Sequence, residues 1–378
     1  MRIRFLLAVA SLTLLSTGCR AFTWGANGSG QGGDGTTTDS PIPIDIGAGW
    51  ATVSAGADYA GFPGPGSQNF TCGIRISGSL WCWGKNAEGR LGDGTTTDRL
   101  TPTQVGTATD WAAVAPGGYH ACGIRAPGTL WCWGSNSNGQ IGVGTGPDGL
   151  VPAQVGVDTD WTDVTAGFTH TCGLRAAGTL WCWGNNSGGQ LGDGTGADRP
   201  TPIVVGAETD WSVITAGETH TCGLRAAGTL WCWGENSAGQ LGDGTTDSRS
   251  SPTQIGTEND WTIVTGGGPH TCGIRAPGTL WCWGFGNNGQ LGWGGFEGRS
   301  IPTQAGTDGD WKAITAGGAH TCGIRAARTL WCWGSNYLGQ LGDGTDVDRG
   351  TPTQVGTATD WFTVSAGGNN TIGLRLQG

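Results

Sequence analysis

Twelve of the 13 cysteines form six pairs whose members stand ten residues apart. Paired cysteines can hold zinc or form a disulfide, but a zinc site needs four ligands at short spacing, and these pairs have no further ligand nearby. A three-residue hairpin loop would place the two members opposite each other on neighbouring strands, where the Cβ separation suits a disulfide. Such bonds persist only in an oxidising compartment. The predicted disulfides are Cys72–Cys82, Cys122–Cys132, Cys172–Cys182, Cys222–Cys232, Cys272–Cys282 and Cys322–Cys332.

The histidines are the second set of groups that could do chemistry. All of them occupy one position of a repeat, and Phe70 and Asn370 take that position in two further copies. A ring of imidazoles could bind a metal ion, but equivalent positions in neighbouring repeats are too far apart to share one ion. We therefore predict a structural role, in hydrogen bonds that hold the Ala-Gly turn before each histidine. The histidines are His120, His170, His220, His270 and His320.

No other group of residues points to catalysis. The loop Gly192-Asp193-Gly194-Thr195 offers one carboxylate without the further ligands that calcium needs, so a turn is expected there. We find no nucleophile with a base, no carboxylate pair that differs between repeats and no phosphate-binding loop. A residue that is present in every repeat usually serves the repeat. The prediction is therefore a protein that is not an enzyme, with no catalytic residue, no metal and no cofactor.

These residues are carried by a repeat with a period of 50 residues. The 76 glycines of the 378-residue chain oppose long helices, and its 21 tryptophans are incompatible with a chain that cannot bury a core. Each copy of Trp-Cys-Trp-Gly leads into a loop such as Asn186 to Thr195, and a seventh, partial copy is Phe22 to Gly25. A period of this length indicates a propeller or a solenoid. The second tryptophans of the copies are Trp83, Trp133, Trp183, Trp233, Trp283 and Trp333.

Each repeat is predicted to form four short antiparallel strands, which is the pattern of a propeller blade. Ala176 to Gly178 fits a three-residue hairpin loop with glycine in the left-handed position. Trp181 and Trp183 point to the same face of their strand, and we expect them to pack blade against blade rather than to stack on carbohydrate or to sense ultraviolet light. The predicted strands of one repeat are Trp161 to Ala166, Thr171 to Arg175, Thr179 to Trp183 and a segment around Thr201 to Val205.

The two ends of the chain decide between a closed ring and an open stack. The last residues supply strands one and two without a third, and the first residues of the repeat region supply strand three without the first two. A ring needs such a clasp because closure removes its free edges. We predict an all-β, seven-bladed propeller formed by one domain, residues 19–378. Its closing blade is shared by about 21–45 and 361–378, with Thr23 opposite Ile372.

Arginine and aspartate also recur once per blade. The arginines end strand two, and the aspartates precede strand one, so antiparallel strands place both on one face of the ring. We predict Arg–Asp contacts along that face, each contributing at most about 1 kcal/mol if exposed. The arginines are Arg75, Arg125, Arg175, Arg225, Arg275, Arg325 and Arg375. The aspartates are Asp110, Asp160, Asp210, Asp260, Asp310 and Asp360.

The N-terminal residues have the three zones of an export signal, and residues 1–18 are predicted to be a signal peptide. The residues before Cys19 resemble a bacterial lipoprotein processing site, which predicts lipidation of Cys19 and a lipoprotein of the cell envelope. An ordinary secretory peptide is the alternative. Without Arg2 and Arg4 the chain carries 17 basic and 29 acidic residues. This charge argues against nucleic acid as a partner, because nucleic-acid affinity comes largely from phosphate neutralisation.

The repeat resembles that of the regulator of chromosome condensation (RCC) family. In one copy the resemblance is carried by Ala166-Gly167, His170, Gly173-Leu174, Gly178, Trp181, Trp183-Gly184, and Asn186 with Gly189 to Gly192, while the cysteine pair departs from the family pattern. The resemblance covers residues 21–378 and implies a seven-bladed propeller. The resemblance implies function only weakly, because members of the family have unrelated functions. The founding member is a nucleotide exchange factor for a nuclear GTPase, and others are a plant ultraviolet receptor and a secreted bacterial β-lactamase-binding inhibitor. Export and disulfides disfavour the exchange-factor function here.

Function is expected where the repeats differ. The turn after strand one and the long loop after strand three share one face, and unusual residues gather there, with an insertion near Ala57 to Ser67. We predict a monomeric exported scaffold that binds a protein or a glycan through this face. The alternatives are a hydrolase or lyase, or a purely structural envelope protein. The candidate residues of the face are Tyr59, Phe62, Phe70, Lys85, Tyr119, Phe168, Phe285, Trp293, Phe296 and Tyr337.

Overall fold

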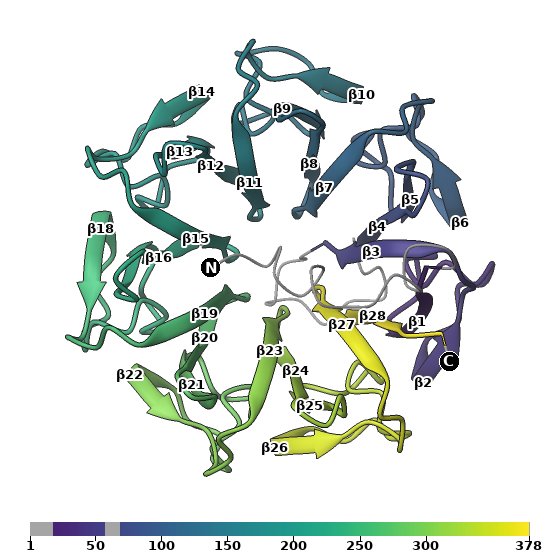
Figure 1. The fold of residues 1–378 in the computed structure, drawn as a ribbon, viewed down its shortest axis with the longest axis vertical. Helices are drawn as coiled ribbons and strands as arrows, with labels where there is room; N and C mark the ends of the chain where they lie inside the picture. The colour runs from purple at the N-terminus through teal and green to yellow at the C-terminus, as the bar shows by residue number, and fades with distance from the viewer. Residues whose placement is uncertain (1–17, 57–68, 378) are drawn as a thin grey trace.

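Seven four-stranded antiparallel sheets surround a central axis (Figure 1). The computed structural model describes residues 18–56 and 69–377. In those ranges the chain forms strands, turns and loops, and no helix there is long and apolar enough to cross a membrane. The predicted all-β, seven-bladed propeller is confirmed. The predicted signal peptide and the insertion near 57–67 fall outside the described residues.

The sheets are named blades A to G. Blade A is β3 (Trp50–Ala55), β4 (Phe70–Arg75), β5 (Leu80–Gly84) and β6 (Arg99–Gln104). Blade B is β7 (Trp111–Pro116), β8 (His120–Arg125), β9 (Thr129–Gly134) and β10 (Gly149–Gln154). Blade C is β11 (Trp161–Ala166), β12 (His170–Arg175), β13 (Leu180–Gly184) and β14 (Arg199–Val204). Blade D is β15 (Trp211–Ala216), β16 (His220–Arg225), β17 (Leu230–Gly234) and β18 (Arg249–Ile255). Blade E is β19 (Trp261–Gly266), β20 (His270–Arg275), β21 (Thr279–Gly284) and β22 (Arg299–Gln304). Blade F is β23 (Trp311–Ala316), β24 (His320–Arg325), β25 (Leu330–Gly334) and β26 (Arg349–Gln354). Blade G is β27 (Trp361–Ala366), β28 (Asn370–Arg375), β1 (Arg20–Gly25) and β2 (Ser40–Asp45).

The ring is closed by strands from both ends of the chain. In blade G the order is β2-β1-β28-β27, so the N-terminal strand β1 pairs with the C-terminal strand β28. Thr23 lies opposite Ile372, as predicted. The closing blade thus has four strands like the others. The pairing of β1 with β28 joins the two ends of the described chain and closes the ring.

The hairpin loop after strand two follows the predicted turn chemistry. Gly178 has φ +75°, which is the left-handed conformation that glycine adopts without a steric penalty. In blade F the same position is Arg328, which holds φ +57°. The propeller therefore tolerates a non-glycine residue at this turn once the flanking strands β24 and β25 are paired.

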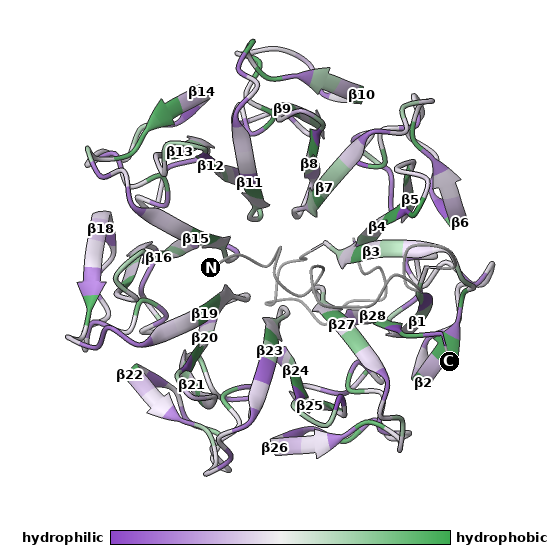
Figure 2. Ribbon diagram, in the orientation of Figure 1, coloured by the Kyte–Doolittle hydropathy of each residue, from purple (hydrophilic) through white to green (hydrophobic). Residues whose placement is uncertain are grey.

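The outermost strand of each blade carries a proline, which has no N–H to offer to another strand. Several of these strands, such as β22 and β26, are largely polar (Figure 2). Both features protect the outer edge from pairing with another chain. The prolines include Pro43, Pro102, Pro152, Pro202, Pro252, Pro302 and Pro352.

The core lies between the blades. Trp183 of blade C is fully buried and packs with Cys122, Leu130 and Ile141 of blade B. This confirms the predicted packing of blade on blade for the second tryptophan of each Trp-Cys-Trp string. The first tryptophan, such as Trp181, packs against the same cluster but is only partly buried.

Candidate functional site

The six predicted cysteine pairs are disulfides. Cys172 lies directly opposite Cys182 in the pairing of β12 with β13, and their Cα atoms are 4.1 Å apart. The other five pairs have the same Cα separation and the same spacing of ten residues. All twelve cysteines are fully buried next to a tryptophan of the following blade. The disulfides are therefore part of the core rather than an exposed redox site.

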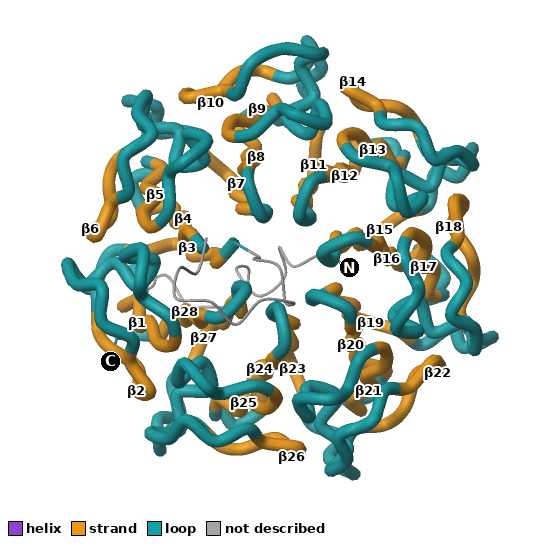
Figure 3. Tube along the Cα trace, turned by 180° about the vertical axis from the view of Figure 1, so that it is seen from behind, coloured by secondary structure: helices purple, strands orange, loops and turns teal. Residues whose placement is uncertain are grey.

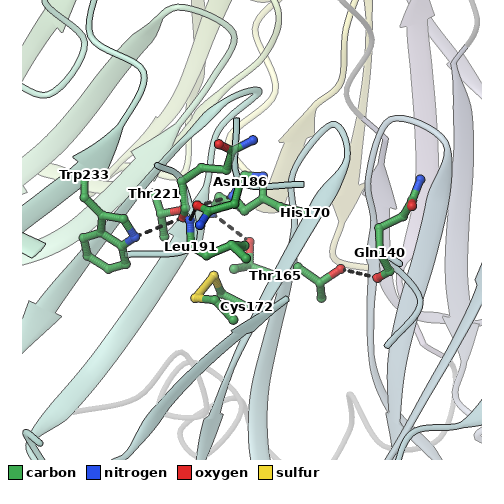
Figure 4. The surroundings of a disulfide bond; sticks show 12 residues. Gln140, Thr165, His170, Cys172, Asn186, Leu191, Thr221 and Trp233 are labelled. Atoms are coloured by element: carbon green, nitrogen blue, oxygen red, sulfur yellow. Dashed lines mark hydrogen bonds between the residues drawn. A yellow bond between two sulfur atoms is a disulfide. The ribbon is translucent and has the colours of Figure 1, made fainter. Parts of the chain in front are cut away.

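Each histidine links its blade to the next. In blade C the ring Nε2 of His170 is 3.0 Å from the hydroxyl oxygen of Thr221 in blade D. Thr221 in turn donates to the carbonyl of Gln190, which also accepts the indole N–H of Trp233 (Figure 4). Since the threonine proton is used on Gln190, the Nε2 of His170 carries the proton that the threonine oxygen accepts. The predicted structural role of histidine is confirmed. Its backbone carbonyl accepts the N–H of Gly167 and so holds the Ala-Gly turn, whereas its imidazole bonds to the next blade, which was not predicted.

Burial keeps these imidazoles neutral. Removal from water lowers the pKa of His120, His170, His270 and His320 to about 3, and that of His220 to about 4. In each ring Nδ1 is buried without a hydrogen-bond partner. Within the described ranges no three histidine, cysteine or acidic side chains come together in a way that could hold a metal ion. The histidine ring therefore serves the contacts between blades.

The interface between blades A and B replaces both partners of this contact. Phe70 stands at the histidine position, and Ala121 stands where the other interfaces have threonine. Both side chains are fully buried in one apolar cluster with Trp133. Phe70 was predicted to be part of an exposed face, and this is wrong because blade B covers its ring. The carbonyl of Arg90, at the glutamine position, still accepts the indole N–H of Trp133.

This natural pair of changes can be reversed. We expect Phe70→His alone to lower the free energy of unfolding by about 1–3 kcal/mol, because its buried N–H would face a methyl group. Ala121→Thr alone should cost a similar amount by overpacking against the phenyl ring. The double variant should be more stable, by about 1–3 kcal/mol, than the sum of the two single losses predicts, since it rebuilds the His–Thr contact of the other interfaces. Urea unfolding of the four proteins measures this coupling, and strictly additive losses would refute it.

A belt of glycines surrounds the axis where the inner strands end (Figure 1). The backbone N–H of Gly118 donates to the carbonyl of Gly167, and the same contact joins Gly268 to Gly317 and Gly318 to Gly367. A Cβ atom at any belt position would lie within 2.8 Å of the carbonyl oxygen of the next belt glycine. We did not predict this contact, although a glycine at the same position of every repeat was its signal. The glycine belt consists of Gly56, Gly117, Gly167, Gly217, Gly267, Gly317 and Gly367.

The Arg–Asp contacts were correctly predicted for six blades. In blades B to G the arginine Nε donates to the aspartate of the same blade at 2.6 to 2.7 Å. We call this face of the ring the rim face. Arg75 of blade A differs because Gly49 takes the aspartate position. Its guanidinium instead donates to the Ala48 carbonyl and lies 3.6 Å over the ring of Trp50.

The long loop after strand three is a closed hydrogen-bond network. In blade C the amide of Asn186 donates to Asp193 and to the carbonyl of Thr195. Burial works to raise the pKa of Asp193, but hydrogen bonds from Thr195 and Arg199 outweigh it and hold that pKa below its ordinary value. The carboxylate is therefore already saturated by protein groups. This agrees with the predicted turn and leaves no ligand set for calcium.

The turns after strand one and the loops after strand three lie on one face, which we call the loop face (Figure 3). Backbone contacts join them: Ser135 donates to the Tyr119 carbonyl, and Phe285 donates to that of Pro269. Phe296 and Tyr337, in the long loops of neighbouring blades E and F, are 49% and 44% exposed. These two aromatic rings are the most accessible of the predicted residues that the structure describes.

Tyr337 donates its hydroxyl to Asn369 while its ring stays exposed, and the other described candidate residues of the loop face are less exposed. The rings of Tyr119 and Phe168 contact each other at a tilt of 55°, with their centroids 4.7 Å apart. Trp293 lies 4.0 Å under the guanidinium of Arg299. Lys85 pairs with a carboxylate 3.3 Å away, and Phe285 is partly buried. Tyr59 and Phe62 lie outside the described residues.

Cys19 lies inside the protein. Its backbone N–H donates to the Trp50 carbonyl, and its side chain packs with Trp50 and Leu374. Burial raises the pKa of its thiol. An acyl chain on this sulfur would require the residues before β1 to leave their place, so the lipid anchor stays a prediction.

Comparisons with known proteins agree with this architecture. A family model described as RCC1-like domain matches residues 66–322, and RCC1 repeat models match residues 311–340 and 329–374. Human WBSCR16 is 20% identical, with a TM-score of 0.82 over 94% of this chain and 98% of that one. Yeast RCC1 (Prp20), solved with Kap60, is 18% identical, with a TM-score of 0.81 over 96% of this chain and 90% of that one. The CRINKLY WD40 ectodomain of the Arabidopsis thaliana receptor kinase ACR4 is 19% identical, with a TM-score of 0.53 over 87% and 92%. No curated protein sequence gives a significant match.

Proposed function

The chain belongs to the RCC1-like domain family, and from this membership and the surface chemistry we propose an exported, non-enzymatic scaffold that binds a protein partner through its loop face. The observation that carries the proposal is the contrast between repeated and unrepeated residues. The repeated His, Asn, Asp and Arg side chains are engaged in hydrogen bonds to other protein groups within or between blades. The exposed aromatic rings of Phe296 and Tyr337 have no counterpart in other blades.

A protein partner fits this surface better than a small substrate. The repeated polar residues that could act in catalysis are used in structural contacts, so a hydrolase or lyase would need other groups. Exposed aromatic residues on a rigid framework are frequent anchors of protein interfaces. Among proteins of this fold, yeast RCC1 was solved with the protein Kap60 bound. Six buried disulfides support folding in an oxidising compartment, which disfavours a cytosolic or nuclear GTPase as the partner of this chain.

The test compares one surface change on each face. The double variant Phe296→Ser/Tyr337→Ser alters the loop face. The control Val157→Ser removes an 89% exposed apolar side chain on the rim face. Immobilised wild-type protein and both variants are incubated with extracellular and envelope fractions, and captured proteins are quantified by mass spectrometry. We then measure the dissociation constant of the partner with each protein.

We expect the partner to bind wild type and Val157→Ser equally, and the double variant at least tenfold more weakly. Unchanged melting temperatures show that the variants remain folded. Equal affinity for all three proteins would contradict binding through the loop face, and loss only with Val157→Ser would move the binding site to the rim face.

A further inference from the structure

A groove of about 350 Å³ lies between blades C and D. Its walls include Asp193 and Val204 of blade C, Glu208 from the connection that leads into blade D, and Arg225 and Trp231 of blade D. The groove thus combines an apolar wall, an aromatic ring, a guanidinium and two carboxylates. Small-molecule sites typically have this size and this mixture of apolar surface with a few polar groups.

One wall of the groove is formed by a residue of β14 that differs from its counterparts in the other blades. Val204 is 49% exposed and stands at the end of that strand. The corresponding residue of five other blades is glutamine, and in blades D and F its side-chain amide donates to the glycine carbonyl two residues later. As a result, β14 is more hydrophobic than the outer strands β18 and β22 (Figure 2). The glutamines are Gln104, Gln154, Gln254, Gln304 and Gln354.

The guanidinium in this groove has fewer contacts than its counterparts. Arg225 donates through Nε to Asp210 at 2.7 Å. In blades B and G the equivalent arginine makes a second contact with the same aspartate, through Nη2. In blades C, E and F it pairs with a second carboxylate at 2.8 to 3.7 Å. Among the described residues, the Nη atoms of Arg225 form no such contact, so their N–H groups can donate to a ligand.

The second carboxylate of blade D does not close onto this arginine. Glu208 takes the position of Asp158 and Asp308, which pair with the arginines of their blades. Within the described residues Glu208 forms no ion pair, and its Oε2 accepts the backbone N–H of Ala207. Donor and acceptor groups of opposite charge therefore both remain available at the wall of one groove.

The aromatic wall completes the site. Trp231 is partly exposed, and its ring is held edge-on to Trp211 with the ring centroids 6.5 Å apart. Its indole N–H already donates to Thr229, so the ring offers an apolar surface rather than a donor. A pyranose has apolar C–H faces and a rim of hydroxyl groups that both donate and accept. We propose that the groove binds a neutral saccharide unit, with its C–H face on Trp231 and its hydroxyls between Arg225 and Glu208.

The charges that line the groove favour a neutral saccharide over an acidic one. Of the charged groups in the groove, Asp193 is paired with Arg199 and the Arg225 guanidinium is neutralised in part by Asp210, so the carboxylate of Glu208 leaves the groove with net negative charge. A uronic acid would meet net negative charge there, whereas a neutral sugar would meet one donor group and one acceptor group. This saccharide site is separate from the loop face and does not depend on the proposed protein partner.

Val204→Gln is the decisive variant, because it restores the residue of five other blades and so is compatible with the fold. Saturation-transfer NMR and calorimetry with the methyl glycosides of glucose, galactose, mannose and N-acetylglucosamine measure binding to the full chain. The matched control is Gln254→Val, which changes the same position of the next groove. Methyl glucuronide and a short tryptophan-containing peptide are the comparison ligands.

We expect at least one neutral glycoside to bind, and Val204→Gln and Glu208→Ala each to weaken it tenfold or more. Gln254→Val should retain the wild-type affinity or bind more strongly. The proposal is overturned if no neutral glycoside binds at 10 mM, a concentration that would detect affinities on the order of millimolar. It is also overturned if affinity survives Val204→Gln, or if the glucuronide or the peptide binds more tightly than every neutral glycoside.

Discussion

Lowering the pH from 7 toward 4 is expected to unfold the propeller, because the unfolded chain then binds protons at five histidines that burial keeps neutral in the folded chain. Their folded pKa values of about 3 to 4 lie below the value of 6.5 for an exposed imidazole. Below pH 6.5 the unfolded chain therefore binds protons that the folded chain does not bind. The stability from neutral histidine is fully present above pH 6.5 and is lost as the pH falls toward 3. Once all five sites are protonated in the unfolded chain, this loss approaches about 7 kcal/mol per pH unit.

The measurement is urea or guanidinium unfolding at intervals between pH 7.5 and 4. His270→Asn is the matched variant, since asparagine occupies this position in blade G as Asn370. It should lose some stability at pH 7.5 and reduce the pH slope by about one fifth, from five protons to four. A free energy of unfolding that is constant from pH 7 to 5 would contradict the expectation.

One other buried group acts in the opposite direction. Burial raises the pKa of Asp163 to about 6, against which a hydrogen bond from the Val164 N–H acts only in part. The charged form is therefore disfavoured in the folded protein, so Asp163 destabilises the fold above pH 6 and ceases to do so near pH 4. A single group of this sign offsets at most a small part of the slope from five histidines.

Gly167→Ala is expected to lower the free energy of unfolding by about 3 kcal/mol, at the upper end of overpacking costs. The added Cβ would lie 2.6 Å from the carbonyl oxygen of Gly217 and 2.6 Å from Nδ1 of His170. Because the first of these neighbours is backbone of the next blade, relief requires two blades to move apart. That movement also weakens the hydrogen bond from the His170 ring to Thr221.

The control is Gly309→Ala, where an added Cβ meets nothing within 4 Å. Thermal and urea unfolding of both variants and wild type measure the difference. The control should be neutral or slightly stabilising, since alanine reduces the entropy of the unfolded chain. Equal stability of both variants would show that the glycine belt is not close-packed.

Contacts within one blade were predictable because they depend on local register. Cys172 and Cys182 are ten residues apart on two strands of one hairpin, so a three-residue loop determines that they face each other. Arg175 and Asp160 are brought together by the same hairpin and the strand before it. Ring closure was also predictable, since the two ends of the chain supply complementary halves of one repeat.

The tryptophan packing between blades was predicted, but the hydrogen bonds between blades were missed because their partners are separated by about one full repeat. His170 and Thr221 are 51 residues apart, and nothing in either segment shows which neighbour it meets. One signal of this pairing was present in the sequence: Phe70 and Ala121, also 51 residues apart, replace the histidine and the threonine together. The exposure of Phe70 was wrongly predicted for the same reason: this ring, at the start of β4, is covered only when the next blade packs against it.

The sequence by itself therefore determined the strands, the number of blades, the disulfides and the ion pairs of the rim face, all of which follow from periodicity and short-range register. Only the tertiary structure decided how the blades contact one another. It placed the histidines on threonines of the next blade and arranged the glycines as a belt. It also left one groove open at Val204, because the space between two blades depends on the side chains of both.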